Sequence, residues 1–191
     1  MIRKLPFILL LVLLASCATK PEDPFAEMDA ASQKTFDAYS KLAKHDHPTS
    51  VILHEGLPHQ MWDAELLESE RNTKETIEIE GYPFYSEPKT IEGKEAEEIL
   101  EILLNPELFV PYGGMKLCGG YHPDYDITTM LGSEDFHIQV CFGCHEVKLI
   151  GESQTITIDM KKGTIDQIRP LLLAHHDQRP ESDFFRAQNN E

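Results

Sequence analysis

The sequence predicts an α+β fold, in which an antiparallel four-stranded meander packs with helices in a single domain. Two observations predict it. After residue 124, short strand-like runs follow one another and are separated by glycine-containing turns, which favours antiparallel neighbours. Before residue 105, apolar residues recur mainly at helical spacing. A chain of 191 residues is long enough for one such domain with its own core.

Three segments of the first half have helical periodicity, over residues 27–44, 59–70 and 92–104. In the second, we expect Trp62, Leu66 and Leu67 to face inward. The third is the clearest, because glutamates in its early turns suit the positive end of a helix dipole. Its expected inward residues are Ala96, Ile99, Leu100 and Leu103. Short strands are predicted over 49–53 and 76–80, followed by an aromatic connection over 81–85.

The four strands of the predicted meander cover residues 125–130, 136–142, 145–150 and 155–159. Turns at 132–133, 143 and 151 separate them. A last helix follows Gly163, and Pro170 should kink it or mark its real start.

The N-terminal residues are arranged as in a secretory signal peptide, with basic residues first, then an apolar run and then small residues. Arg3 and Lys4 precede an apolar run over residues 5–14 that is too short to cross a bilayer. The segment then ends in Leu14-Ala15-Ser16-Cys17, which resembles the lipobox of bacterial lipoproteins. That resemblance implies cleavage before Cys17 and its acylation with chains such as palmitate. Ala18, rather than Asp, follows the cysteine and favours the outer membrane over the inner one in an organism with two membranes.

These patterns divide the chain into four parts. We expect a signal peptide over 1–16, a lipid-anchored tether over 17–30, an α+β domain over 31–178 and a frayed tail over 179–191. The predicted location is the cell envelope, and the lipid anchor makes the membrane a partner.

The remaining chain is strongly acidic. Two of the 17 Lys and Arg residues lie in the N-terminal segment and none of the 33 Asp and Glu do, so the rest carries a formal charge of −18. Such a surface repels phosphate backbones, which excludes nucleic acid as a partner. The charge otherwise serves solubility.

Residues 118–145 hold three of the four cysteines. If the turn between the first two meander strands centres on residues 132–133, Tyr125 lies opposite Cys141. The loop before Tyr125 and the turn after Cys141 then share one end of the sheet. This places five residues together: Cys118, His122, Cys141, Cys144 and His145.

A disulfide is the first chemistry that this cluster could support, because exported proteins meet an oxidising compartment. A Cys118–Cys141 or Cys118–Cys144 bond would add about 3 kcal/mol of stability. A Cys141–Cys144 bond would be more redox-active than structural.

Two alternatives remain open. Cys118, Cys141 and Cys144 with His122 or His145 could hold tetrahedral zinc, although Gly143 precedes the last cysteine where a zinc knuckle has its glycine after it. Cys141-Phe142-Gly143-Cys144-His145 also matches the c-type haem pattern, with His145 as the proximal ligand. The flanking strand-like runs do not suit a helical haem domain. We favour the structural cluster over zinc, and zinc over haem.

No catalytic residue is indicated. His45, His47, His175 and His176 lie at helix ends, where they suit the dipole. Glu55, Asp124 and Asp126 have no partner at a catalytic spacing, so we expect capping or solvated roles. The sequence therefore predicts a non-enzymatic binding or structural domain whose protein or small-molecule partner it does not identify.

Four segments resemble an uncharacterised family of exported bacterial proteins. They are HEGLPHQMWDAE (54–65), GYPFY (81–85), KLCGGYHPDYDI (116–127) and CFGCHEVKLIG (141–151). The family has a CGG-aromatic-H-x-D segment before a meander and CF-x-C after its second strand, and the likeness would cover residues 50–175. It implies that Cys118, Cys141 and Cys144 belong to one motif and that His145 is not an axial ligand. It implies no activity.

Overall fold

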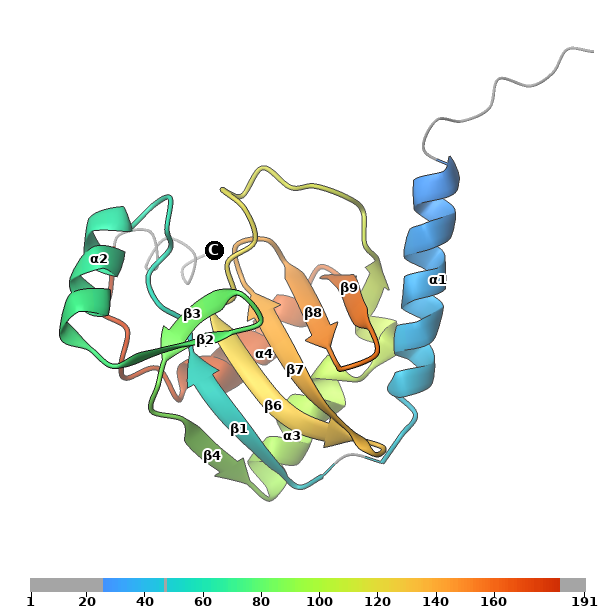
Figure 1. Ribbon diagram of the computed structural model, residues 1–191. Helices are drawn as coiled ribbons and strands as arrows, with labels where there is room; N and C mark the ends of the chain where they lie inside the picture. The colour runs from blue at the N-terminus through green and yellow to red at the C-terminus, as the bar shows by residue number, and fades with distance from the viewer. Residues whose placement is uncertain (1–25, 47, 183–191) are drawn as a thin grey trace, which may run out of the picture.

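A computed structural model describes residues 26–46 and 48–182 of the chain. The predicted signal peptide, the lipidation of Cys17, most of the tether, His47 and residues 183–191 lie outside these residues and stay predictions. The described part combines helices with antiparallel sheets, so the predicted α+β class is confirmed (Figure 1).

The main sheet is wider than predicted. It has seven strands in the order β4-β1-β6-β7-β8-β9-β5, all paired antiparallel. Four consecutive strands lie side by side at its centre: β6 (Tyr125–Leu131), β7 (Glu134–Cys141), β8 (Glu146–Ile150) and β9 (Thr155–Met160). On one side of them lie β1 (Ser50–Glu55) and β4 (Lys89–Glu92), and on the other lies β5 (Phe109–Pro111), which follows a 3-10 turn over Pro106–Leu108.

The register of the β6–β7 hairpin differs from the prediction by one residue. Only Gly132 and Ser133 form the turn, because Leu131 pairs with Glu134. Tyr125 therefore lies opposite Val140 rather than Cys141. The predicted consequence holds, because the segment before Tyr125 still reaches the same end of the sheet as the β7–β8 turn.

The predicted aromatic connection is a strand. β2 (Thr76–Ile79) pairs with β3 (Tyr82–Tyr85) in a separate two-stranded sheet. A two-residue turn joins them, and its residues Glu80 and Gly81 both have positive φ, as tight hairpin turns require. Pro83 in β3 obscures the strand pattern in the sequence.

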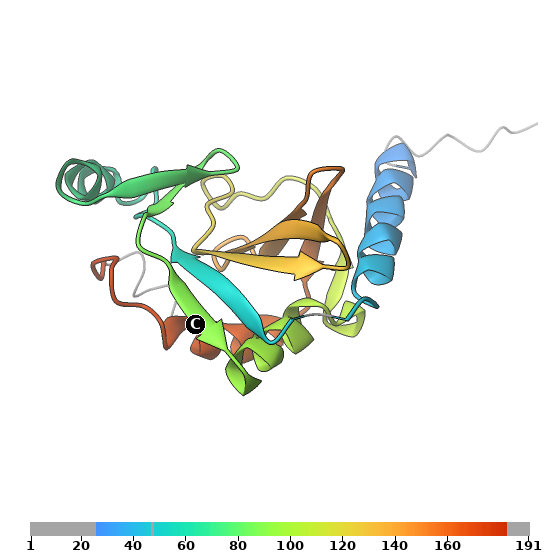
Figure 2. The ribbon, with the colours of Figure 1, turned by 60° about the horizontal axis from the view of Figure 1, so that its bottom comes forward.

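Two helices, α3 (Lys94–Leu103) and α4 (Thr164–Leu173), cover one face of the main sheet (Figure 2). The inward face predicted for α3 is confirmed, because Ala96, Ile99, Leu100 and Leu103 are all fully buried. Pro170 lies inside α4, near its end, rather than at its start.

Helix α1 (Ala26–Leu42) packs beside the β9–β5 edge. Its Tyr39 ring lies 5.5 Å from the Phe109 ring, and the Tyr39 hydroxyl donates to the Leu103 carbonyl at 2.9 Å. The helix begins at Ala26, within the residues predicted as tether.

Helix α2 (Ala64–Thr73) begins later than predicted. Trp62 precedes it and is 51% exposed, so the inward position predicted for Trp62 is wrong. Leu67 faces inward as predicted and packs with Leu57 and Tyr85 in a small second core beside the β2–β3 hairpin. No helix of the described residues is long and apolar enough to span a membrane.

Candidate functional site

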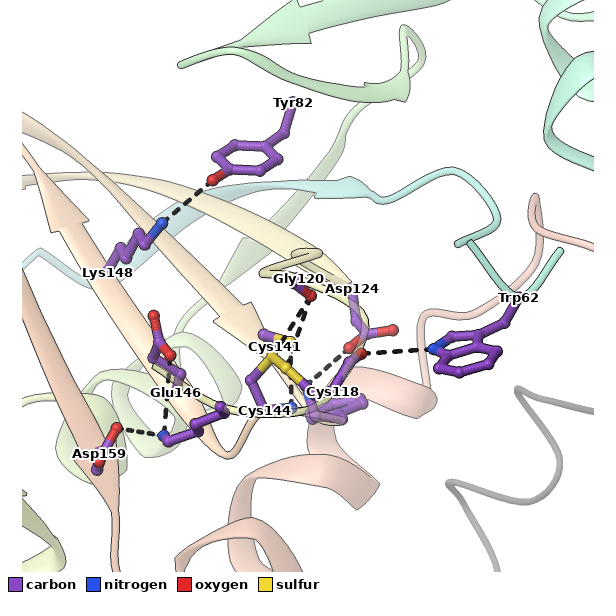
Figure 3. Close-up of a disulfide and its surroundings, with 12 residues drawn as sticks. Trp62, Tyr82, Cys118, Gly120, Asp124, Cys141, Cys144, Glu146, Lys148 and Asp159 are labelled. Atoms are coloured by element: carbon purple, nitrogen blue, oxygen red, sulfur yellow. Dashed lines mark hydrogen bonds and ion pairs between the residues drawn. A yellow bond between two sulfur atoms is a disulfide. The ribbon is translucent and has the colours of Figure 1, made fainter. Parts of the chain in front are cut away.

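The loop 112–124 and the turn 142–145 meet at one end of the main sheet (Figure 3). A disulfide between Cys118 and Cys144 joins them, with 5.7 Å between the two Cα atoms. The predicted disulfide is confirmed, and among the pairings left open this is the one that forms. We call residues 55–62, 112–124 and 142–145 the disulfide end.

Cys141 is the remaining thiol in the described residues, and it lies buried at the end of β7. Its sulfur accepts the Cys144 backbone N–H at 3.3 Å. Burial raises the pKa of this thiol to about 12. Cys141 therefore stays protonated at neutral pH and is a poor nucleophile or metal ligand.

The described residues do not fit the zinc and haem interpretations while the disulfide is formed. The zinc interpretation needs the sulfurs of Cys118 and Cys144, and the haem interpretation needs that of Cys144, but these two sulfurs are bonded to each other. His122 is buried and its Nε2 lies 2.7 Å from the Leu57 carbonyl, whereas His145 is exposed on the turn. Within residues 26–46 and 48–182, no group of three or more His, Cys, Asp or Glu side chains is placed to hold a metal ion.

The rings of His59 and His122 are in contact, with centroids 4.7 Å apart and the ring planes tilted by 48°. Burial lowers the pKa of His122 to about 4 and also lowers the pKa of His59. Both rings are therefore neutral at pH 7, and the Nδ1 atom of His59 accepts the Met61 backbone N–H at 3.0 Å. This pair positions the loop before α2.

Glu55 ends β1 and is 2% exposed. Its carboxylate accepts the backbone N–H groups of Asp177, Gln178 and Arg179 at 2.9–3.2 Å and contacts His176. Burial would raise the pKa of Glu55, but the bonds from His176 and from the backbone outweigh it and lower the pKa. We call residues 176–179 the C-terminal strap.

Asp124 joins this strap to the disulfide end. One oxygen accepts the Phe142 backbone N–H at 2.7 Å, and the other accepts Arg179 Nη1 at 3.0 Å. Both side chains are buried, and Arg179 lies at the start of the segment predicted as a frayed tail. Glu55 and Asp124 are buried structural groups rather than the solvated or capping groups that the sequence predicted. Their partners in the strap are more than fifty residues away in the chain, which no local pattern reveals.

Asp126 is also buried, on the opposite face of the sheet from the helices. Its carboxylate lies 2.9 Å from Nδ1 of His137 on the neighbouring strand, and this bond raises the pKa of His137. Asp126 is thus, like Asp124, an acidic residue with a structural role that sequence analysis did not assign.

A pocket of about 270 Å³ lies beside the disulfide. Lys116 lines it and pairs with Asp159 and, at 3.8 Å, with Glu146. Burial raises the pKa of Glu146. Two tyrosines, Tyr112 and Tyr121, line the same pocket.

Lys148 lies at the inner side of this pocket, between two aromatic rings. Its ammonium is 3.6 Å from the centre of the Tyr121 ring and donates to the Tyr82 hydroxyl at 3.1 Å (Figure 3). Tyr121 in turn donates to the Gln139 carbonyl at 2.8 Å. Sequence reasoning missed both lysines as site residues, because the segments that bring them together are separate in the chain.

Comparisons with known proteins add little. A scan against protein-family models finds no match, and a search of curated proteins finds no significant relative. Among solved structures, the chain is similar to a protein from Clostridium perfringens that is provisionally named a lipoprotein. The two share 12% identity over 84% of this chain and 97% of that one, with a TM-score of 0.37. The resemblance drawn from the sequence motifs stays a prediction.

Proposed function

We propose that this protein is a lipid-anchored, non-enzymatic protein of the cell envelope, and that its disulfide end is its binding surface. The Cys118–Cys144 disulfide carries the proposal, because such bonds persist in oxidising compartments outside the cytoplasm. It agrees with the signal-peptide order and with Leu14-Ala15-Ser16-Cys17 at the N-terminus. Ala18 favours the outer membrane where two membranes exist.

The ionisable side chains of the disulfide end already have structural partners, which supports a non-enzymatic role. Asp124 binds Phe142 and Arg179, and Glu55 binds the strap. His122 is neutral and bonded to a backbone carbonyl. A catalytic acid or base needs a free position facing a substrate, and these groups do not have one.

The pocket beside the disulfide supports a binding role. Its volume of about 270 Å³ suits a small ligand. Lys116 and Lys148 present ammonium groups and Glu146 presents a carboxyl group, so a polar ligand could form charge-assisted hydrogen bonds there.

Metabolic labelling with palmitate tests the anchor. Wild-type protein expressed in a bacterial host with lipoprotein processing should incorporate label, and Cys17→Ser should not. Cys141→Ala is the matched control, since it removes a cysteine elsewhere and should leave the label unchanged. Labelled Cys17→Ser protein would refute the anchor.

Thiol titration tests the compartment and the cysteine chemistry together. Denatured but unreduced protein from the envelope fraction should show one free thiol, that of Cys141, because Cys17 is acylated and Cys118 is bonded to Cys144. Three titratable thiols with stoichiometric zinc would replace this proposal with a metal-binding one. A pyridine haemochrome spectrum would do the same for haem.

A further inference from the structure

The disulfide end exposes large apolar side chains from neighbouring segments. Leu117 and Met115 are fully or almost fully exposed, at 103% and 92%, while Met61 and Trp62 are 58% and 51% exposed. The Trp62 indole N–H lies 3.4 Å from the Cys118 carbonyl oxygen, so the loop before α2 adjoins the loop 112–124. We call Met61, Trp62, Met115 and Leu117 the apolar rim. An exposed apolar group of this kind marks an interaction surface.

Met28, in the first turns of α1, extends this rim toward the N-terminus. It is 55% exposed, and its methyl group lies 3.8 Å from the position that a Cβ on Gly114 would occupy. The first turns of α1 therefore adjoin the loop that carries Met115. In both ribbon views, the start of α1 and the loop 112–124 lie at the same side of the molecule (Figures 1 and 2).

The segments that carry the rim are poor in carboxylates. The chain has 33 Asp and Glu among 191 residues, yet residues 56–62 and 111–123 contain none. Lys116 is the one Lys or Arg in these two segments. Asp29 and Asp63 flank the rim, and Asp63 accepts a hydrogen bond from Ser182. Fewer carboxylates in these segments mean weaker repulsion from an anionic membrane than the acidity of the whole chain would give.

The anchor has a short reach. Between Cys17 and the start of α1 at Ala26, the chain can extend at most about 30 Å. The lipid therefore keeps the start of α1, and with it the rim, close to the membrane surface.

We infer that the apolar rim docks on the lipid surface that holds the anchor. Trp62 suits the interface, because its ring is apolar and its N–H is polar. Met115 and Leu117 would enter the headgroup boundary by about 5–10 Å. The disulfide fixes the loop that presents them, so no folding of the loop on contact is needed. This inference rests on the proposed lipid anchor at Cys17.

Fluorescence quenching tests the docking, because Trp62 is the one tryptophan of the chain. Lipidated full-length protein is reconstituted into vesicles of phosphatidylethanolamine and phosphatidylglycerol, with or without brominated acyl chains. Docking at this depth predicts a roughly twofold loss of Trp62 emission in the brominated vesicles. Met115→Ser with Leu117→Ser should restore most of the emission while co-sedimentation with vesicles persists.

A variant with the tryptophan moved is the matched control. Met130 is 52% exposed on β6, near the hairpin turn at the far end of the sheet. Trp62→Phe with Met130→Trp should show no quenching. Equal quenching at both positions, or none at Trp62 in protein that co-sediments, would overturn the docking. Protein that fails to co-sediment would instead refute the anchor.

The apolar rim could also bind a second copy of the chain, and this alternative has its own test. Sedimentation of the unlipidated Cys17→Ser protein should give a monomer. A dimer that Leu117→Ser dissociates would assign the rim to self-association and overturn the membrane inference.

Discussion

The two ends of the central sheet are closed by different means. At the disulfide end, three kinds of bond join segments that are distant in sequence. They are the Cys118–Cys144 disulfide, the ion pair between Asp124 and Arg179, and the hydrogen bonds of Glu55 to the strap. At the other end, which we call the hairpin end, Gly132 and Ser133 turn the chain in two residues. A long loop needs additional bonds to hold it, because its backbone makes no hydrogen bonds to a neighbouring strand. A tight turn is held by the paired strands that it connects. Mutations should therefore cost most at the disulfide end.

The largest effect is expected from Arg179→Met. The change leaves the buried Asp124 carboxylate without its charged partner, which should lower the free energy of unfolding by about 3–5 kcal/mol. Urea unfolding measures it. The matched control is Arg71→Met, which removes an exposed arginine near the end of α2 and should change the free energy of unfolding by less than about 0.5 kcal/mol. Similar losses in the two variants would contradict the importance of the strap.

Removing the disulfide should cost slightly less. Cys118→Ser with Cys144→Ser frees a loop whose ends are 26 residues apart, which corresponds to about 3.5 kcal/mol of chain entropy. A reducing agent should lower the unfolding midpoint of the wild type to that of the double variant and leave the variant unchanged. A wild type insensitive to reductant would show that the bond is absent from the protein in solution.

The stability of the disulfide end should depend on pH through His122. Its folded pKa is about 4, below the unfolded value of 6.5, so only the unfolded chain binds the proton between these values. Stability is then complete above pH 6.5 and falls by about 3 kcal/mol as the pH drops to 4. His59 contributes in the same direction. Glu55, with its lowered pKa, adds a further loss at still lower pH, below its unfolded value.

Unfolding curves at several pH values check this, with His122→Gln as the test variant and His145→Gln as the exposed control. The first should flatten the pH profile between 6.5 and 4, and the second should preserve it. A profile that His122→Gln leaves unchanged would assign the pH dependence elsewhere.

The smallest effect belongs to the hairpin end. Gly132 has a φ of 67°, so Gly132→Ala should cost about 1 kcal/mol through backbone strain alone. Ser133→Ala is its neighbour control and should change stability by less than about 0.5 kcal/mol. If Gly132→Ala lowered the free energy of unfolding as much as removal of the disulfide does, the two ends of the sheet would not differ in their sensitivity to mutation.

Local sequence patterns predicted the parts of the fold that depend on local chemistry. Helix α3 was predicted with its buried face, and the strands β6 to β9 were found by their apolar alternation. The short strands β4 and β5 were missed, since three or four residues carry no periodic signal. Pro83 concealed β3, and the exposed position of Trp62 depends on a contact with the distant Cys118.

The candidate site was predictable only in part. The spacing of the cysteines and the expected meander brought Cys118, Cys141 and Cys144 to one end of the sheet. Which two would bond depended on the turn 142–145, which brings the Cys144 sulfur to Cys118 and leaves Cys141 as the thiol. The pairing of Glu55 with the strap could not be predicted, because more than 120 residues separate the partners.

The C-terminal strap also has a consequence for folding. Glu55 and Asp124 obtain their charged partners, His176 and Arg179, from segments more than 50 residues further along the chain. A partly folded domain without the strap in place would leave two buried carboxylates unpaired at this end of the sheet, which is costly. We therefore expect the sheet and the strap to form together, in one cooperative folding step.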